Sequence, residues 1–297
     1  MKIFRFRKPA PEPPTARRVQ ELEIITSRLI RLGFAGDYHA AFHGKGIEFS
    51  QVREYQPGDD IRTIDWNVTA RTGSPHVKQF IEERDLTVLL ALDCSASMRF
   101  GSLDRRKIDL ASELAAVLAF SAAQNADRVG LLVFSSRMHS FIPPKRGRNH
   151  VQSLVRSAIL AGKQVGGTTD LSGAVQFLQR VAVKRSVIIF ISDFLDVPVQ
   201  KPFSRLSQKH DVIALSVGDP REQSFPSGGL IRLRDSENGR DRLVALKNSD
   251  VARLTGNHQS RLVNEFRKSG VDWVSLSTAV PYDRTLVRFF HKRISRP

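Results

Sequence analysis

Cysteine is almost absent from this sequence of 297 residues, in which Cys94 stands alone. A single thiol cannot form an internal disulfide, so the sequence excludes a small disulfide-stapled secreted fold and favours a reducing compartment. Long apolar runs are also lacking: the longest, residues 86–92 and 187–191, are far shorter than the ~20 residues that a membrane-spanning helix needs. The basic first residues lead into four prolines between positions 9 and 14 rather than an apolar signal segment. These absences predict a cytoplasmic protein without a transmembrane segment.

From residue 86 onwards, short β-branched runs alternate with amphipathic stretches at helical spacing. This alternation is typical of an α/β fold with a mostly parallel, doubly wound sheet and helices on both of its faces. Apolar residues at helical spacing predict core-facing helices within residues 108–122, 151–159 and 171–181. Strands are expected at Thr87–Leu92, Arg128–Phe134, Val187–Ser192, Val212–Val217 and Asp272–Leu276, with a short edge strand at Met138–Ile142.

The chain is long enough for this domain and a smaller appended one. We expect a flexible, basic and proline-rich N-terminus over residues 1–14, and a helix at 19–32 with a small β-rich module over 15–85, packed against the larger domain. The α/β domain then spans 86–297, with a hairpin inserted at about 228–247 around Asn238-Gly239, a pair that favours tight turns. Helices are expected at about 251–268 and 282–294. The last helix is basic and amphipathic, which suits docking on the sheet or, alternatively, contact with a membrane surface.

The first strand of the α/β domain ends in a run of oxygen-bearing side chains, Asp93-Cys94-Ser95-Ala96-Ser97. Alternate residues of an extended turn project in the same direction, so Asp93, Ser95 and Ser97 can converge on one ion. The loop lies at the carboxyl edge of the sheet, where open α/β folds bind ligands. A lone Asp-x-Ser-x-Ser run is more often a polar turn with a helix cap, so the motif needs partners to indicate a metal site.

Two later loops supply such partners at the same edge. Residues 166–170 offer the hydroxyl of Thr168 ahead of a helix, and Asp193 follows a later strand. Together the three loops provide hard oxygen ligands and no soft ones, which favours Mg²⁺ or Mn²⁺, allows Ca²⁺ and argues against Zn²⁺. An ion held by only two carboxylates and three hydroxyls stays incompletely neutralised. It can therefore accept an acidic side chain from a partner protein.

These positions resemble the metal-ion-dependent adhesion site of von Willebrand factor A domains. In that family a D-x-S-x-S motif, a Thr of a second loop and an Asp of a third hold a divalent ion. The resemblance implies a von Willebrand factor A-like fold, and it assigns the metal ligands to Asp93, Ser95, Ser97, Thr168 and Asp193.

The segment between residues 44 and 71 is dense in charged and aromatic side chains around a Pro57-Gly58 turn. Such clusters are more often structural than catalytic, so we expect a salt-bridge network that holds the small module to the large domain. The network would join Arg53, Arg62 and Arg71 to Glu54, Asp59, Asp60 and Asp65.

This segment, followed by residues 77–84 and the metal motif, resembles the bacterial family called domain of unknown function 58. The similarity runs from about Gly44 to Asp193 and continues more loosely to the C-terminus. Many members carry two membrane helices near the N-terminus, which this chain lacks, so it resembles a shorter soluble form. Members are commonly linked to MoxR-type AAA+ ATPases. The resemblance therefore implies an adaptor that binds such an ATPase in the assembly or activation of another complex.

The leading hypothesis is thus a non-enzymatic adaptor, with two alternatives. A phosphatase or other hydrolase would need a second Asp where Ser95 stands, or an Arg one residue beyond Arg99 to complete a Cys94-based motif. A nucleic-acid-binding protein would fit the net charge of +16, although the basic residues are spread along the chain. The run Lys145-Arg146-Gly147-Arg148 is expected as a solvated loop beside the metal edge.

Overall fold

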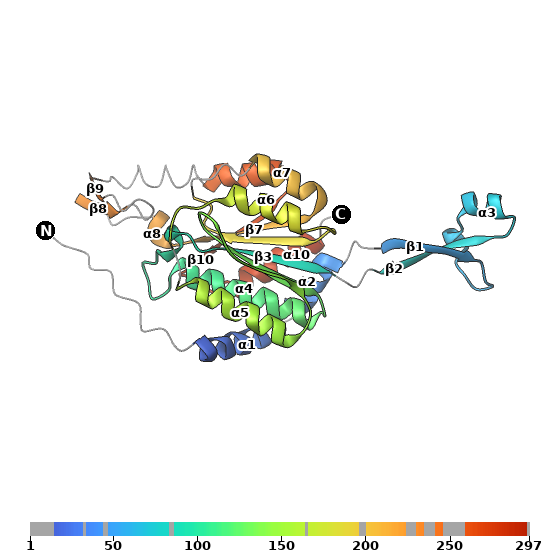
Figure 1. The fold of residues 1–297 in the computed structure, drawn as a ribbon, viewed down its shortest axis with the longest axis horizontal. Coiled ribbons are helices and arrows are strands. Elements are labelled where there is room, and N and C mark those ends of the chain that lie inside the picture. Colours follow the sequence, from blue (N-terminus) through green and yellow to red (C-terminus); the bar gives the residue numbers. More distant parts are fainter. Residues whose placement is uncertain are drawn as a thin grey trace.

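The computed structural model describes residues 15–31, 34–43, 47–82, 86–163, 166–195, 200–223, 230–234, 241–245 and 259–295. At its centre lies a six-stranded sheet with strand order β10-β7-β6-β3-β4-β5. Neighbouring strands are parallel except for β5, which pairs antiparallel to β4 at the edge. The mostly parallel α/β fold predicted from the sequence is confirmed (Figure 1). The strands are β3 (Thr87–Asp93), β4 (Arg128–Phe134), β5 (Met138–Lys145), β6 (Val187–Ser192), β7 (Asp211–Gly218) and β10 (Asp272–Ser277).

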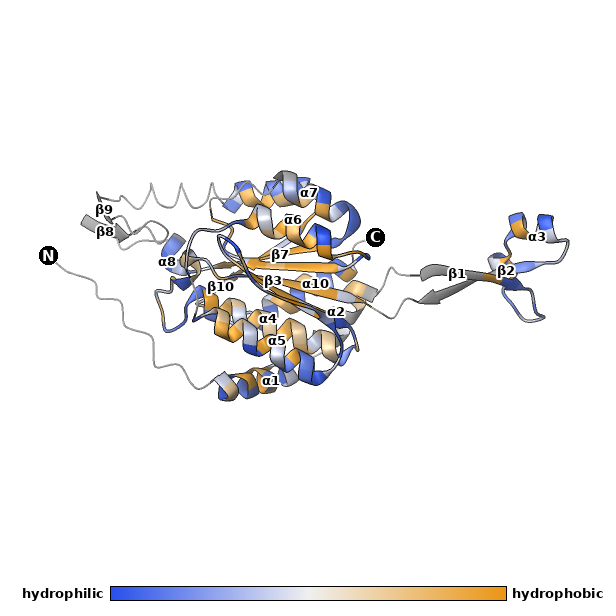
Figure 2. Cartoon of the chain, in the orientation of Figure 1, coloured by the Kyte–Doolittle hydropathy of each residue, from blue (hydrophilic) through white to orange (hydrophobic). Residues whose placement is uncertain are grey.

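Helices cover both faces of the sheet because its strands are apolar on both sides (Figure 2). Alternate side chains of a strand point to opposite faces, so Leu90 joins one apolar cluster and Leu89 the other. One cluster includes side chains of α4 (Lys107–Gln124), α5 (Arg148–Ala161) and α10 (Asp283–Ile294). The second includes side chains of α6 (Leu171–Val181), α7 (Gln200–Lys209) and the helical residues 259–268.

The two helices at the N-terminus belong to this α/β body. Val19, Leu22 and Leu29 of α1 (Thr15–Arg31) are buried in the apolar cluster that contains α4 and α5. Tyr38 of α2 (Phe34–His43) is also buried there, and its ring lies 6.1 Å from that of Phe290 in α10. The expected grouping of the first helix with the β-rich module therefore does not describe its packing, because its apolar side chains complete the large core.

The β-rich segment is a long hairpin that extends away from the body, at the end opposite α8 (Pro220–Gln223) (Figure 1). We expected this module to pack against the larger domain, and the structure corrects that expectation. Among the hairpin side chains that the structure describes, Val77 is the one buried apolar side chain, whereas Ile61 and Trp66 are exposed rather than packed on the body. Its elements are β1 (Ile47–Glu54), η1 (Ile61–Thr63), α3 (Trp66–Thr72) and β2 (His76–Glu82).

A second hairpin lies where the sequence predicted an insertion. β8 (Leu230–Arg234) pairs antiparallel with β9 (Asp241–Ala245). The Asn238-Gly239 turn, residues 251–258 of the next predicted helix and the N-terminal residues 1–14 lie outside the described residues.

The final helix, α10, docks on the body as expected, with Leu286 and Phe290 buried in the large core. Over the described part of the chain, we find no helix with the length and apolar character required to cross a membrane.

Candidate metal centre at the carboxyl edge of the sheet

The two predicted carboxylates are brought together by strand pairing. β3 and β6 are parallel neighbours in the middle of the sheet, with Leu92 opposite Ile191. Asp93 at the end of β3 and Asp193 just after β6 therefore reach the same edge, and both are buried. Two carboxylates buried side by side repel one another, so this edge favours a cation.

Hydrogen bonds fix the Asp93 carboxylate. Its Oδ1 accepts from the backbone N–H of Ser95 at 2.8 Å, and its Oδ2 accepts from the Ser192 hydroxyl at 2.6 Å. The hydroxyl oxygens of Ser95 and Ser97 lie 3.2 Å apart. Burial and, second, the Asp193 carboxylate raise the pKa of Asp93 to about 7, against the opposing effect of these hydrogen bonds. The hydrogen bonds alone thus leave the ionised form of Asp93 poorly compensated.

The loop that carries Thr168 lies against the first loop through its backbone. The Gly167 carbonyl accepts from the Ala96 N–H at 3.0 Å, and the Gly166 N–H donates to the Cys94 carbonyl at 3.3 Å. Gly167 has φ of +81°, a left-handed conformation that favours glycine. The side chain of Thr168 is exposed. The structure therefore places this loop beside the cluster of Asp93, Ser95 and Ser97 without showing its hydroxyl bound to them.

The loop after β6 is held in a strained conformation. Phe194 has φ of +53°, which is uncommon for a residue other than glycine. Its N–H donates to the Ser192 hydroxyl at 3.1 Å, and its ring packs 5.1 Å from that of Phe266. Strain of this kind persists only where surrounding contacts hold it, and here those contacts set the direction of Asp193.

Sequence reasoning missed a buried lysine in this site. Lys107, the first residue of α4, has no exposed surface, and its ammonium donates to Asp193 Oδ2 at 2.7 Å and to Glu222 Oε1 at 2.5 Å. Burial alone would lower the pKa of Lys107, but the carboxylates of Asp193 and Glu222 outweigh burial and raise it. These contacts span 86 and 115 residues of sequence, so no local pattern signals them.

The side chains present fit a hard divalent cation. Among the described residues, no group of three or more His, Cys, Asp or Glu side chains is placed to hold a metal, so hydroxyls must complete the ligand set. Asp93 and Asp193 supply carboxylate oxygens, and Ser95 and Ser97 supply adjacent hydroxyls. An oxygen-only set of this kind suits Mg²⁺, Mn²⁺ or Ca²⁺. Such an ion would also supply the charge that the buried Asp93 carboxylate lacks.

Cys94, which lies inside the same loop, is unsuited to nucleophilic chemistry. Its side chain is buried, and burial followed by the Asp93 charge raises its pKa to about 12. The thiolate is the nucleophile in cysteine chemistry, and this thiol stays protonated at neutral pH. The geometry therefore argues against the Cys-based phosphatase considered from the sequence.

Within the part of the chain that the structure describes, the contacts of the charged cluster in the first hairpin lie inside the hairpin itself. Arg53 pairs with Asp59 through two hydrogen bonds of 2.7 Å, and both residues lie within the hairpin. Asp60 accepts from the Arg62 N–H at the start of η1, and Asp65 caps α3. The expected network thus stabilises the local structure between β1 and β2, because two of its carboxylates bind backbone N–H groups there.

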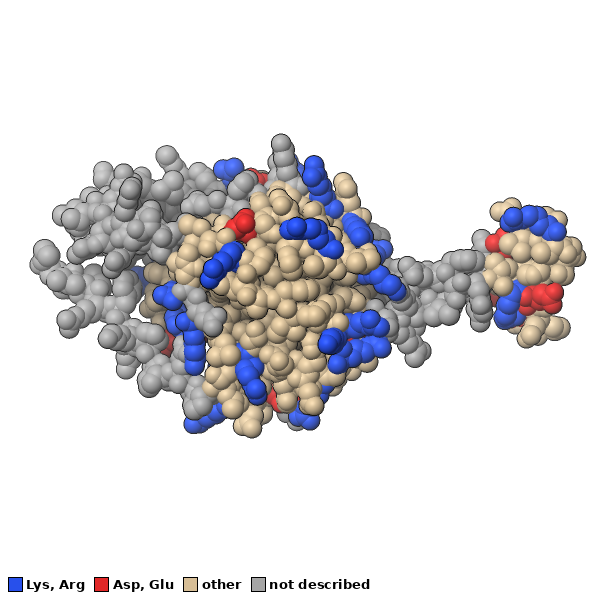
Figure 3. All heavy atoms as spheres, viewed as in Figure 1, with Lys and Arg blue, Asp and Glu red and all other residues tan. Residues whose placement is uncertain are grey.

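The basic run that begins at Lys145, the last residue of β5, lies at the opposite edge from the metal site, which corrects our expectation. β5 runs antiparallel to β4 and pairs Lys145 with Val129, at the amino end of the parallel strands. Arg148 binds Glu23 of α1 there. Figure 3 shows Lys and Arg side chains at several separate places on one face of the body rather than in one stripe.

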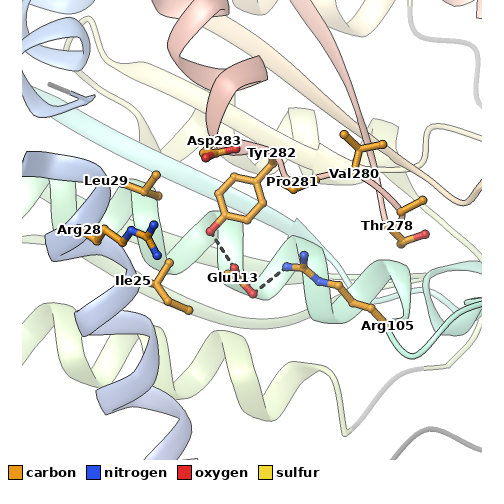
Figure 4. Close-up of a pocket in the computed structure, with 11 residues that line it drawn as sticks. Ile25, Arg28, Leu29, Arg105, Glu113, Thr278, Val280, Pro281, Tyr282 and Asp283 are labelled. Carbon is orange, nitrogen blue, oxygen red and sulfur yellow. Dashed lines mark hydrogen bonds and ion pairs between the residues drawn. The ribbon is translucent and has the colours of Figure 1, made fainter. Parts of the chain in front are cut away.

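A cavity of about 480 Å³ lies between α1, the loop before α4 and the segment that leads into α10 (Figure 4). Glu113 lines it and accepts hydrogen bonds from the Tyr282 hydroxyl and from Arg105, each at 2.7 Å. Arg18 adds a third contact to the same carboxylate at 3.2 Å. The cavity holds none of the predicted metal ligands.

Comparison with known proteins decides the family. The model of the family described as "Protein of unknown function DUF58" matches residues 51–261. The chain belongs to this family. An uncharacterised protein of Mycobacterium tuberculosis is 33% identical over 287 residues, covering 95% of this chain and 90% of its own, and one of Mycobacterium bovis matches equally.

Two solved structures from Bacteroides species, each 19% identical, resemble this DUF58 chain. The conserved hypothetical protein BatB of Bacteroides thetaiotaomicron has a TM-score of 0.46 and covers 71% of this chain and 100% of its own. An aerotolerance-related membrane protein of Bacteroides fragilis has a TM-score of 0.48, with coverages of 70% and 99%.

Proposed function

We propose that this protein is a non-enzymatic adaptor that binds a partner protein through a divalent metal ion at the carboxyl edge of its sheet. The observation that carries the proposal is the buried Asp93 carboxylate, which lies with Asp193 and the hydroxyls of Ser95 and Ser97 at one edge. Thr168, on the loop beside them, is the fifth proposed ligand. When bound, the ion would offer a free coordination position to an acidic side chain of the partner.

The chemistry of the edge favours binding over catalysis. Cys94 is protonated and buried, and Ser95 stands where a phosphatase of the aspartyl type would place its acid/base carboxylate. Asp93 itself is held by Ser95 and Ser192, which suits a fixed ligand more than an attacking group. A hydrolase remains the alternative hypothesis and predicts turnover of a phosphate ester in Mg²⁺.

The partner that we propose is an AAA+ ATPase of the MoxR type, which follows from the resemblance of the sequence to its family. Such an ATPase consumes ATP, so the proposal also assigns this protein to the cytoplasm. Mg²⁺ is the expected ion, with Mn²⁺ as a substitute, because the ligand set consists of carboxylates and hydroxyls.

The experiment measures binding of the purified full chain to a purified MoxR-type ATPase by biolayer interferometry, in Mg²⁺, after EDTA, and after Mg²⁺ is restored. We expect EDTA to abolish binding and restored Mg²⁺ to recover it. We also expect the Asp93→Ala and Ser95→Ala variants not to bind the ATPase. Asp104→Asn is the matched control, because Asp104 is an exposed carboxylate in the loop before α4. Equal binding by Asp93→Ala and by the unaltered protein would refute the metal-dependent adaptor.

A further inference from the structure

Lys107 is an unusual neighbour for a cation site, because it already supplies a positive charge there. Its ammonium is fully buried and lies 2.7 Å from Oδ2 of Asp193, which is one of the proposed metal ligands. Burying an ammonium is costly unless it is paired and hydrogen-bonded. The lysine and a metal ion therefore compete for the same carboxylate.

Glu222 provides the lysine with a second partner that is independent of the metal ligands. Its Oε1 accepts from Lys107 Nζ, and its Oε2 accepts from the N–H of Asp219 at 2.9 Å. Asp219 is itself held by Ser102 and Thr278. Glu222 is thus fixed in α8, directly after β7, where it can keep the ammonium when Asp193 turns to a metal.

The formal charges of the cluster match a divalent ion. Asp93, Asp193 and Glu222 contribute −3 when ionised, and Lys107 contributes +1, which leaves −2 for an ion to neutralise. Without the lysine the same cluster would carry −3. A site of −3 attracts any cation more strongly than a site of −2.

We propose that Lys107 is a built-in competitor for the divalent cation, holding Asp193 in the metal-free protein and passing to Glu222 alone when the ion binds. The inference rests on the proposed function, since it deepens the description of the same site. It makes Lys107 and Glu222 positioning residues that set the affinity for the metal. It also links occupancy of the site to α8, the segment that leads from β7 towards the β8–β9 hairpin.

The two residues have opposite expected effects. Lys107→Met removes the competitor, so we expect Mg²⁺ and Mn²⁺ to bind at least about tenfold more tightly, which corresponds to about 1.4 kcal/mol. Glu222→Gln removes the lysine's alternative partner, so the ammonium would hold Asp193 more firmly and the metal should bind about three- to tenfold more weakly. If Glu222 acts through Lys107, this weakening disappears in the Lys107→Met, Glu222→Gln double variant.

The test is titration of the EDTA-stripped full chain with Mg²⁺ by calorimetry and with Mn²⁺ by electron paramagnetic resonance. Lys292→Met, at an exposed lysine of α10, is the matched control and should bind as the unaltered protein does. Circular dichroism checks that each variant folds. If Lys107→Met does not fold, unchanged or tighter metal binding by Glu222→Gln, which keeps the buried pair of Lys107 and Asp193, would still overturn the competitor role.

The outcomes separate this inference from the proposed function. Unchanged or weaker metal binding by Lys107→Met, or a Glu222→Gln effect that persists in the double variant, would overturn the competitor role while leaving the site in place. Equal binding by Asp93→Ala and the unaltered chain would instead overturn the site. Binding by Lys107→Met where the unaltered chain binds too weakly to measure would support the competitor role.

Discussion

The Ser192 hydroxyl donates a 2.6 Å hydrogen bond to Asp93 Oδ2, and both side chains are fully buried. This contact ties the last residue of β6 to the last residue of β3 at the edge where we place the metal. The same hydroxyl accepts from the N–H of Phe194, which holds the loop that carries Asp193. Ser192 thus orients both carboxylates of the site.

Replacing Ser192 with Ala removes a donor from Asp93 and an acceptor from Phe194. We expect the variant to lose roughly 1–3 kcal/mol of stability, because two buried polar groups lose a partner. We also expect weaker Mg²⁺ binding, since the Asp93 carboxylate loses its orientation. Urea unfolding with and without Mg²⁺ measures both effects. Ser186→Ala, at another buried hydroxyl near the start of β6, should lose stability but keep the response to Mg²⁺.

The pKa of Asp93 predicts how the metal response depends on pH. The folded-state value of about 7 lies above the ordinary 3.8, so the metal-free fold binds a proton that the unfolded chain releases between these values. Stability of the metal-free protein should therefore fall as the pH rises from about 4 to about 7. Metal binding needs the ionised carboxylate, so the rise in Tm that Mg²⁺ produces should be larger at pH 8 than at pH 6.

Thermal unfolding at several pH values, with Mg²⁺ or EDTA, tests this expectation. Asp93→Asn is the control, because an amide does not titrate, and its Tm should not respond to Mg²⁺. If Mg²⁺ raises the Tm of the unaltered protein equally at pH 6 and pH 8, metal binding is not coupled to ionisation of Asp93.

The main sheet was predictable from the sequence because its strands are buried on both faces. Such strands appear as continuous apolar runs between helical periodicities, and β4 and β6 have the predicted bounds. The extent of β5 was less clear, since it continues to Lys145 through Pro143 and Pro144, which an edge strand tolerates. The packing of α1 and the projection of the hairpin depend on which distant surfaces meet, and local patterns do not specify that.

The candidate site was predictable in part for the same reason. Asp93 and Asp193 follow neighbouring parallel strands, so the topology alone brings them together. Lys107 and Glu222 come from distant segments, and only the folded arrangement shows that Lys107 contacts Asp193 and that Glu222 contacts Lys107. Ser192 precedes Asp193 in the sequence, but its hydrogen bond to Asp93 also depends on how β6 lies beside β3. The exposed side chain of Thr168 leaves that ligand as a prediction.

Gly167 tests the loop that presents Thr168. A side chain at φ of +81° is strained, and an added Cβ would lie 2.9 Å from the Ser136 hydroxyl oxygen. Gly167→Ala should therefore cost about 1–2 kcal/mol and weaken Mg²⁺ binding, because the Gly167 carbonyl anchors Ala96. Gly166→Ala is the matched control, since its Cβ would meet nothing within 4 Å. If calorimetric titration gives the same Mg²⁺ affinity for both variants, the loop that carries Thr168 does not contribute to the metal site.

The cavity network predicts a stability effect that is separate from the metal. Tyr282→Phe leaves the buried Glu113 carboxylate with Arg105 and Arg18 but removes the Tyr282 hydroxyl that donates to it. We therefore expect the free energy of unfolding to fall by about 1–2 kcal/mol. Glu113→Ala should cost more, since it also leaves the Tyr282 hydroxyl unpaired inside the protein. Urea unfolding measures both losses. Mg²⁺ binding should be unchanged in Tyr282→Phe, and a weaker affinity would contradict the separation of the two sites.

Trp66 reports on the projecting hairpin, because it is 70% exposed in α3, while the second tryptophan, Trp273 of β10, is partly buried and packs against the apolar cluster that contains α6 and α7. In Trp273→Phe, we expect emission typical of a water-exposed indole, strong quenching by iodide, and little change while circular dichroism follows unfolding of the α/β body. Trp66→Phe is the reciprocal variant, and its Trp273 emission should shift together with that unfolding. A shielded Trp66 whose emission follows the body would show that the hairpin folds back against it, since an indole in contact with the core cannot remain accessible to iodide.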